Sequence, residues 1–125
     1  MALNEGNSGR FASIIGTFLL IEGMLGFSSP VVFGVFSTNR LHACIHIVLG
    51  CIGLFTRFRG GTRTFALLVG ILLIAVGVLY FIPGVSALIV SLLNVNTAVA
   101  VFNIVVGIVG VVVARTTPEP TPIGA

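Results

Sequence analysis

The stretch that decides the fold is Gly16-Thr-Phe-Leu-Leu-Ile-Glu-Gly-Met-Leu-Gly-Phe27, which aligns without a gap with Gly70-Ile-Leu-Leu-Ile-Ala-Val-Gly-Val-Leu-Tyr-Phe81. A second pair of stretches aligns in the same way: Asn39-x6-His46-Ile-Val-Leu-Gly50-Cys-Ile-Gly53 with Asn96-x6-Asn103-Ile-Val-Val-Gly107-Ile-Val-Gly110. Self-similarity at a fixed spacing indicates that one structural unit is used twice. We therefore expect two repeats, at about residues 11–57 and 64–114. They differ in polar content, because Glu22 aligns with Val76 and His46 aligns with Asn103.

The composition indicates a chain that lies in a lipid bilayer. Of its 125 residues, 57% are hydrophobic and 7% are charged, whereas soluble domains carry about 25% charged residues. Four apolar segments, at about residues 11–27, 39–55, 65–82 and 96–114, approach the ~20 residues that cross a hydrocarbon core. We predict an all-α integral membrane protein, a four-transmembrane-helix bundle that forms a single domain over residues 11–114. Its two repeats are tandem helical hairpins.

The arginines predict the orientation of the bundle. Five of the six lie on one side of the predicted spans and Arg40 alone lies on the other; the five are Arg10, Arg57, Arg59, Arg63 and Arg115. Because positive charge is enriched in cytoplasmic loops, we expect both termini in the cytoplasm. Residues 1–10 would form a cytoplasmic N-terminal segment and residues 115–125 a flexible, proline-rich cytoplasmic tail. Since the arginines lie between apolar segments, the bilayer is the expected partner and nucleic acid is not.

Two apolar stretches, residues 31–36 and 85–93, lie between the spans on the outer side. Nine residues are too few to cross a bilayer, so we expect both to be interfacial segments at the outer end of the bundle. They would either plug and anchor that end or act as a lid over a cavity at Glu22 and His46.

Small and polar residues predict which helix faces pack together. Small residues let backbones approach closely where no hydrophobic force drives helices together. Helical spacing places such residues on one stripe of each span, so we assign them to packed faces: Gly16, Gly23, Gly50, Gly53, Gly70, Gly77, Gly107 and Gly110. Asn39 and Asn96 each precede a span and are expected to cap its first turn. Asn103 is expected to make an interhelical hydrogen bond.

Glu22 and His46 are the residues that point to chemistry. An ionised carboxylate in hydrocarbon costs several kcal/mol, so an intramembrane Glu faces a partner, water or a ligand. Glu22 lies five positions before Phe27 and His46 lies five positions after Leu41, both near the outer ends of their spans, and at ~1.5 Å per residue they reach nearly the same depth. We therefore predict a hydrogen bond or ion pair, with Glu22 either protonated or charged. It is either a structural link between two helices or a ligand or proton site.

His42 and His46 lie one turn apart and permit a cofactor role. Two histidines on one helix cannot take both axial positions of one haem, but one of them could hold a single tetrapyrrole, or a haem shared across a dimer. A metal held by His42, His46 and Glu22 would be a two-His-one-carboxylate site, although His42 could instead be solvated. We predict no metal and leave the cofactor unknown. Cys44 and Cys51 are too far apart for a disulfide and are expected to be inert.

The run Asn39-x-x-His42-x3-His46-x3-Gly50-x2-Gly53 resembles small bacterial membrane proteins catalogued as a domain of unknown function, in the DoxX-like neighbourhood. The resemblance covers about residues 16–113, and Asn39, His42, Gly50 and Gly53 match its pattern. The fourth span departs from it, with Val99 where a His is expected. The resemblance implies the four-span fold and a bacterial inner-membrane location, and it implies no known activity.

Three classes of function fit these observations. Enzyme signatures are absent from the sequence, so we expect an accessory or interaction subunit of a larger membrane complex, with a membrane-protein partner or as a homo-oligomer. The alternatives are a pigment, haem or metal binder that uses His42 or His46, and a small proton-coupled or redox membrane protein that uses Glu22 and His46.

Overall fold

The computed structural model describes residues 6–118, which form five helices and one short strand pair. In chain order the elements are α1 (Gly6–Ser28), β1 (Val31–Val32), β2 (Phe36–Ser37), α2 (Arg40–Arg59), α3 (Thr62–Tyr80), α4 (Ser86–Leu93) and α5 (Thr97–Thr116). Four of the helices, α1, α2, α3 and α5, are long and apolar enough to cross a membrane. The predicted all-α, four-span fold is therefore confirmed.

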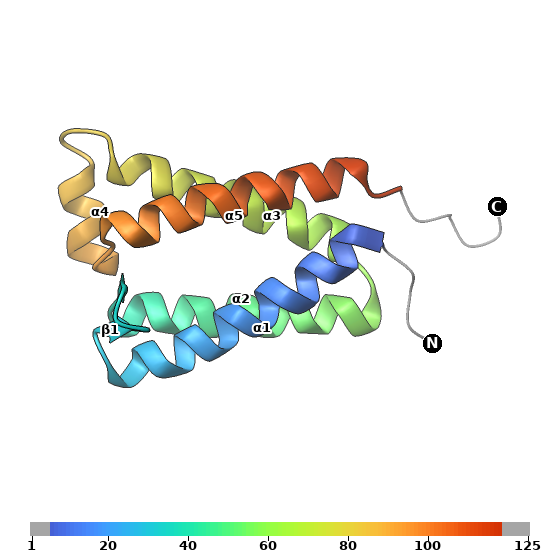
Figure 1. Ribbon diagram of the computed structural model, residues 1–125, viewed down its shortest axis with the longest axis horizontal. Helices are drawn as coiled ribbons and strands as arrows, with labels where there is room; N and C mark the ends of the chain where they lie inside the picture. The colour runs from blue at the N-terminus through green and yellow to red at the C-terminus, as the bar shows by residue number, and fades with distance from the viewer. Residues whose placement is uncertain (1–5, 119–125) are drawn as a thin grey trace.

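The four long helices form two antiparallel hairpins that lie one above the other in Figure 1. The first hairpin is α1 with α2, and the second is α3 with α5. A turn with two consecutive glycines, Gly60 and Gly61, joins the hairpins; their φ angles of 101° and 98° are rarely open to other residues. Helix α4 and the β1–β2 strand pair lie at the end of the bundle opposite this turn (Figure 1).

Some boundaries differ from the predicted ones. Helix α1 begins at Gly6, whereas the sequence predicted residue 11, because the first turn is held by contacts that hydropathy does not reveal. The backbone N–H of Ser8 donates to Thr117 Oγ1 at 3.2 Å, and the two hydroxyls lie 2.7 Å apart. Of the expected tail at residues 115–125, Arg115 and Thr116 belong to α5, and residues 119–125 lie outside the described residues.

Glycines bring the two helices of each hairpin together. A Cβ added at Gly50 would lie 2.6 Å from the backbone oxygen of Gly16, and one added at Gly107 would lie 2.6 Å from that of Gly70. Further out, Gly23 packs against Ala43, and Gly77 packs against Ala100 in the same way. Because no side chain fits between these backbones, each hairpin is fixed by a glycine seam, which we define as Gly16, Gly23 and Gly50 in the first hairpin and Gly70, Gly77 and Gly107 in the second.

The hairpins contact each other through a reciprocal pair of phenylalanines. Phe65 of α3 packs on Gly53 of the first hairpin, and Phe11 of α1 packs on Gly110 of the second. The two rings lie 6.5 Å apart at the centre of a cluster of buried apolar side chains. Gly53 therefore serves a contact between hairpins, and Gly110 serves both kinds of contact, because it also packs against the backbone of Ala66 in its own hairpin.

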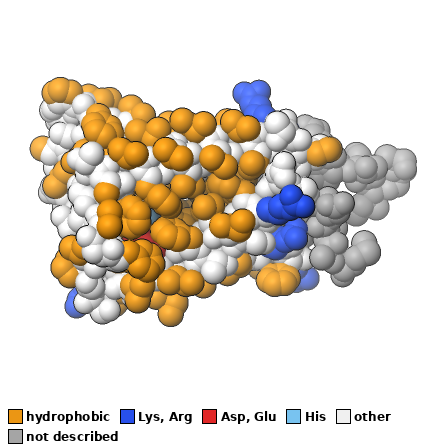
Figure 2. Space-filling view, in the orientation of Figure 1, with side chains coloured by type: hydrophobic (Ala, Val, Ile, Leu, Met, Phe, Trp, Pro, Cys, Tyr) orange, Lys and Arg blue, Asp and Glu red, His pale blue; other side chains and the backbone are white. Residues whose placement is uncertain are grey.

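Charge is unevenly distributed along the bundle. Most of the arginine side chains on the face shown in Figure 2 lie at the end that holds the α2–α3 turn, and hydrophobic side chains are spread over the rest of that face. At that end the Arg63 Nε–H donates to the backbone oxygen of Ala114 at 3.0 Å, and the Arg57 guanidinium lies over Gly9. Arg40 begins α2 at the opposite end, beside the ring of Phe27.

Candidate functional site

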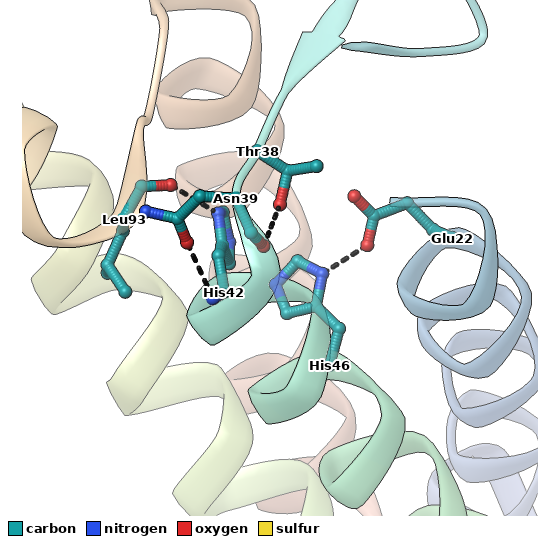
Figure 3. Close-up of polar contacts among 6 residues, drawn as sticks. All are labelled: Glu22, Thr38, Asn39, His42, His46 and Leu93. Atoms are coloured by element: carbon teal, nitrogen blue, oxygen red, sulfur yellow. Dashed lines mark hydrogen bonds and ion pairs between the residues drawn. The ribbon is translucent and has the colours of Figure 1, made fainter. Parts of the chain in front are cut away.

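The structure brings Glu22 and His46 together inside the first hairpin. Glu22 lies on the face of α1 that packs against α2, and its Oε2 shares a hydrogen bond with Nδ1 of His46 (Figure 3). The two residues are 3% and 6% exposed. Because a carboxyl group enclosed in this way needs a partner, we name this contact the Glu22–His46 pair and take it as the centre of the site.

His42 lies one turn before His46, and its ring meets that of His46 edge-on with the centroids 4.2 Å apart. Asn39 sets the start of this helix, because its Oδ1 accepts a hydrogen bond from the His42 backbone N–H at 2.9 Å. The His42 Nδ1–H donates to the backbone oxygen of Leu93, 3.0 Å away at the end of α4. His42 is 3% exposed, so the solvated position considered from the sequence is wrong. The backbone oxygen of Leu93 at the end of α4 accepts the hydrogen bond that water would accept from a solvated His42.

These hydrogen bonds fix how the two imidazoles face the rest of the bundle. A backbone carbonyl can only accept, so Nδ1 of His42 carries the proton, and in a neutral ring Nε2 then presents a lone pair. Nδ1 of His46 is likewise engaged by Glu22. Within residues 6–118, neither Nε2 atom has a hydrogen-bond partner. Both nitrogens are therefore available to a molecule that enters the site.

A cavity of about 160 Å³ adjoins the two imidazoles. We name it the imidazole cavity. Its polar lining is His42, His46 and Asn103, and its apolar lining comes from α2, α3 and the end of α4: Ile45, Leu49, Leu72, Leu73, Val76 and Leu93. Ile45 and Leu72 are also exposed on the outer surface of the bundle, so the cavity reaches the lipid-facing side between α2 and α3.

Asn103 completes the polar lining but not in the way the sequence predicted. It is 2% exposed, yet its side chain makes no hydrogen bond with any residue of the described part of the chain. The predicted interhelical hydrogen bond of Asn103 is therefore wrong. Val76, which aligns with Glu22, offers no polar atom, and Nδ1 of His46 is already hydrogen-bonded to Glu22. No fully enclosed side-chain nitrogen or oxygen in residues 6–118 lacks a partner, so the Asn103 amide keeps contact with the cavity.

The two outer loops are held together by hydrogen bonds that sequence reasoning missed. Asn39 Nδ2–H donates to the backbone oxygen of Leu92 at 2.8 Å, and Asn96 Nδ2–H donates to that of Val35 at 2.8 Å. The Oδ1 of each asparagine meanwhile caps its own helix. Each residue therefore has two roles. Only the cap could be found from the sequence, because the carbonyl that accepts the second bond belongs to a distant loop.

The strand pair and α4 lie over the outer end, where two interfacial segments were expected. Val31 and Val32 pair with Ser37 and Phe36 in an antiparallel register. Ser37 Oγ–H donates to the backbone oxygen of Asn94 at 2.6 Å, which links this strand pair to the end of α4. Helix α4 thus lies beside His42, whereas the strand pair packs against α1 and α5 and is linked to the end of α4.

The donor set limits which cofactors the site could hold. The described residues contain no cluster of three or more His, Cys, Asp or Glu side chains that could hold a metal ion, and Cys44 and Cys51 are exposed. The cavity is also smaller than the ~300 Å³ at which pockets for drug-sized ligands begin. A tetrapyrrole does not fit inside it.

Comparison with known proteins places the chain in a family. Residues 10–116 match the family described as "Domain of unknown function (DUF4383)", and the chain belongs to this family. No curated protein and no solved structure matches the chain.

Proposed function

We propose that this protein binds a small polar molecule in the imidazole cavity, inside the membrane. The observation that carries the proposal is the convergence of three buried polar side chains, His42, His46 and Asn103, on one small and mostly apolar cavity. The free Nε2 atoms and the Asn103 amide are not fully enclosed, so they keep contact with the cavity. A ligand in the cavity could therefore form hydrogen bonds with them.

Comparison of the two sides of the bundle supports this proposal. The alignment that pairs Glu22 with Val76 also pairs Leu72 of the cavity with Phe18. The alignment that pairs His46 with Asn103 pairs Ile45 with Phe102 and, extended to the preceding residues, Leu93 with Phe36. Those three phenylalanines pack on one another, with centroid distances of 5.0 Å between Phe18 and Phe102 and 5.2 Å between Phe36 and Phe102. Aromatic rings thus fill one side of the bundle. The smaller aliphatic side chains on the other side leave space beside the histidines.

The size and lining of the cavity indicate the class of ligand. An apolar cavity of about 150 Å³ holds one benzene molecule, so a volume of about 160 Å³ suits a single six-membered ring. A hydroxyl group on that ring could donate to Nε2 of His42 or His46 and accept from the Asn103 amide. We infer that the ligand is a hydroxyl-bearing ring of about the size of phenol, which enters from the lipid between Ile45 and Leu72.

A binding measurement on the purified protein tests this proposal. Phenol added to the protein in mild detergent is expected to raise the thermal unfolding temperature in a saturable way, and benzene is expected to raise it less. Asn103→Val removes one polar contact at nearly constant volume and should weaken phenol binding about five-fold while sparing benzene. Equal effects of phenol on the wild type and Asn103→Val would contradict the proposal.

A cavity-filling variant provides the matched control. Leu72→Phe places in the cavity the side chain that Phe18 supplies on the other side of the bundle, so it should abolish binding of both ligands. Val78→Phe changes an exposed α3 side chain that does not line the cavity and should leave binding unchanged. The absorption spectrum of the purified protein tests the pigment alternative, because a bound tetrapyrrole would absorb visible light.

An accessory role in a larger membrane complex is the second candidate function. It is favoured by the lipid-facing surface: every long helix carries large exposed hydrophobic side chains, among them Ile14, Val48, Leu68 and Val105. We propose that this surface docks against another membrane protein and that the chain has no catalytic activity of its own. Crosslinking in native membranes, followed by identification of the crosslinked protein, tests this role. Crosslinks only to lipid would contradict it.

We further propose that the chain is a duplicated hairpin in the bacterial inner membrane with both termini in the cytoplasm, and that its family belongs in the DoxX-like neighbourhood. The equivalent glycine seams and the reciprocal packing of Phe11 and Phe65 support the duplication. Five arginines at one end and Arg40 at the other support the orientation. Labelling of single cysteines by a membrane-impermeant reagent in intact cells tests it, because a Cys at position 59 should be protected and one at position 40 should react.

A further inference from the structure

We propose that a groove between α1 and α5 binds one acyl chain of an anionic phospholipid, whose phosphate lies at Arg10. The groove is on a different helix pair from the imidazole cavity and has a volume of about 370 Å³. It does not depend on the ligand binding proposed for the imidazole cavity, because no residue lines both sites.

The shape of the groove follows from a row of valines on α5. Val105, Val109 and Val113 lie on one stripe of α5 and face Ile14 and Ile15 of α1. Short branched side chains on one wall and longer ones on the other leave a furrow, which we name the valine groove. From Val105 to Val113 it runs ~12 Å along the helix, at 1.5 Å per residue. That length lies within one leaflet of a hydrocarbon core ~30 Å thick.

Both ends of the valine groove are defined. Toward the strand pair it ends at Phe18 of α1 and Phe102 of α5. The ring centroids of these two residues lie 5.0 Å apart across the same α1–α5 interface. At the other end Asn7 and Arg10, three residues apart on α1, line its mouth. A chain that enters beside Arg10 therefore meets a continuous apolar wall and stops at the two phenylalanines.

The charge at the mouth selects the headgroup. Arg10 is exposed and has no ion-pair partner among residues 6–118. Arg57 lies over the neighbouring Gly9, so a second guanidinium adds positive potential at this end of α1. The Asn7 side chain offers an uncharged hydrogen-bond donor one turn away. An anionic phosphodiester complements this set, whereas a zwitterionic headgroup gains less from it.

The opposite side of the bundle lacks these features. In the alignment of the two hairpins, Arg10 corresponds to Thr64, Asn7 to Gly61 and Val109 to Ile52. The corresponding interface between α2 and α3 thus has no arginine at the position of Arg10 and has a larger side chain on its wall. This asymmetry argues for a selected lipid at the α1–α5 seam, because general solvation by acyl chains would not distinguish the two seams.

Lipid retention measured by native mass spectrometry tests the proposal. The full chain, purified in an uncharged detergent, is mixed with phosphatidylglycerol or phosphatidylcholine of the same acyl composition. We expect the wild type to retain one phosphatidylglycerol about five-fold more strongly than phosphatidylcholine, which corresponds to one arginine near a membrane surface. Arg10→Gln should remove this preference. Arg40→Gln, at the other end of the bundle, should keep it.

Substitutions in the groove wall separate the acyl chain from the headgroup. Val109→Phe should fill the furrow and reduce retention of both lipids, whereas the matched Ile52→Phe on the opposite seam should not. Far-ultraviolet circular dichroism confirms that each variant keeps its helices. An unchanged preference in Arg10→Gln, or unchanged retention in Val109→Phe, would overturn the proposal.

Two further outcomes identify a different occupant. If inorganic phosphate displaces phosphatidylglycerol, the site binds a free anion and the groove has no part in binding. If the wild type is a dimer that Val109→Phe converts to a monomer, a second copy of the chain occupies the groove. Either result would overturn the assignment of a phospholipid.

Discussion

The two hairpins share a backbone arrangement but differ in the polarity of their interiors. In both, backbones approach at matched glycines, Gly16 with Gly50 and Gly70 with Gly107. In the first hairpin the helices also share the Glu22–His46 pair, whereas Val76 and Asn103 stand at the aligned positions of the second. The second hairpin packs without an ionisable pair. The glycine seams are therefore the packing feature that both hairpins share, and the Glu22–His46 pair is a feature of the first hairpin alone.

The largest effect is expected when one member of the Glu22–His46 pair is removed. His46→Asn installs the residue of the second hairpin but leaves Glu22 enclosed without its partner. Breaking a buried pair in this way costs about 3–5 kcal/mol, much of it the cost of an uncompensated polar group. The double variant Glu22→Val with His46→Asn reproduces the second hairpin at both positions and should recover most of that loss. Unfolding by titration with sodium dodecyl sulfate in mixed micelles measures both.

A double-mutant cycle decides how the two side chains depend on each other. If the cost of the double variant equals the sum of the single costs, Glu22 and His46 are energetically independent. That result would contradict the contrast between the hairpins. Glu22 and His46 would then each stabilise the first hairpin separately, as its glycines do.

The next effect concerns the glycine seams and should be the same in both hairpins. A Cβ at Gly50 or Gly107 would lie 2.6 Å from a backbone oxygen of the neighbouring helix, so alanine forces the helices apart. Overpacking of this kind costs about 1–3 kcal/mol. Gly50→Ala and Gly107→Ala should lower the free energy of unfolding by similar amounts. Gly34→Ala in the β1–β2 loop is not such a test, because Gly34 has a φ of 70°. Ala98→Gly, on α5 away from the seam, serves as the control.

The fold was predictable because its determinants are local or repeated. Hydropathy located the four spans, and glycines at helical spacing gave the faces that pack. The strand pair could not be found, because Phe33 adopts a φ of 55°, a conformation that turn signals assign to Gly, Asn or Asp. Its stability comes from contacts with Phe18 and with the end of α4, which no local pattern encodes.

The site was predictable only in part. Glu22 could be paired with His46 because their depths are measured from the same membrane surface. The number of residues between each position and that surface was enough to place them at one level. The burial of His42 depends on the carbonyl of Leu93, a backbone atom 51 positions away that carries no sequence signal. The imidazole cavity is a consequence of side-chain volumes on three helices, so it follows from Leu72 and Ile45 only after the packing is known.

The difference in aromatic filling gives a smaller effect. Phe18 aligns with Leu72 of the imidazole cavity. Phe18→Leu should therefore open a similar space between α1 and α5. Loss of the ring contacts with Phe33, Phe36 and Phe102 should destabilise the protein by about 1–2 kcal/mol. Phenol should not bind there as it does in the imidazole cavity. Saturable phenol binding at this seam in a Phe18→Leu, Leu72→Phe double variant would show that space alone is sufficient, without His42.

The smallest effect separates the two roles of the capping asparagines. Asn39→Ala and Asn96→Ala each remove a helix cap and a bond to the opposite outer loop, so each should cost about 1–2 kcal/mol. Asn39→Asp and Asn96→Asp keep the Oδ1 cap but lose the Nδ2–H donor to Leu92 or Val35. They should cost less than the alanine variants. Hydrogen exchange should then quicken at the outer loops and not in the first turn of α2 or α5. Unequal effects of Asn39→Asp and Asn96→Asp would show that the two loops do not hold each other equally, and the variant with the larger loss would identify the tighter contact.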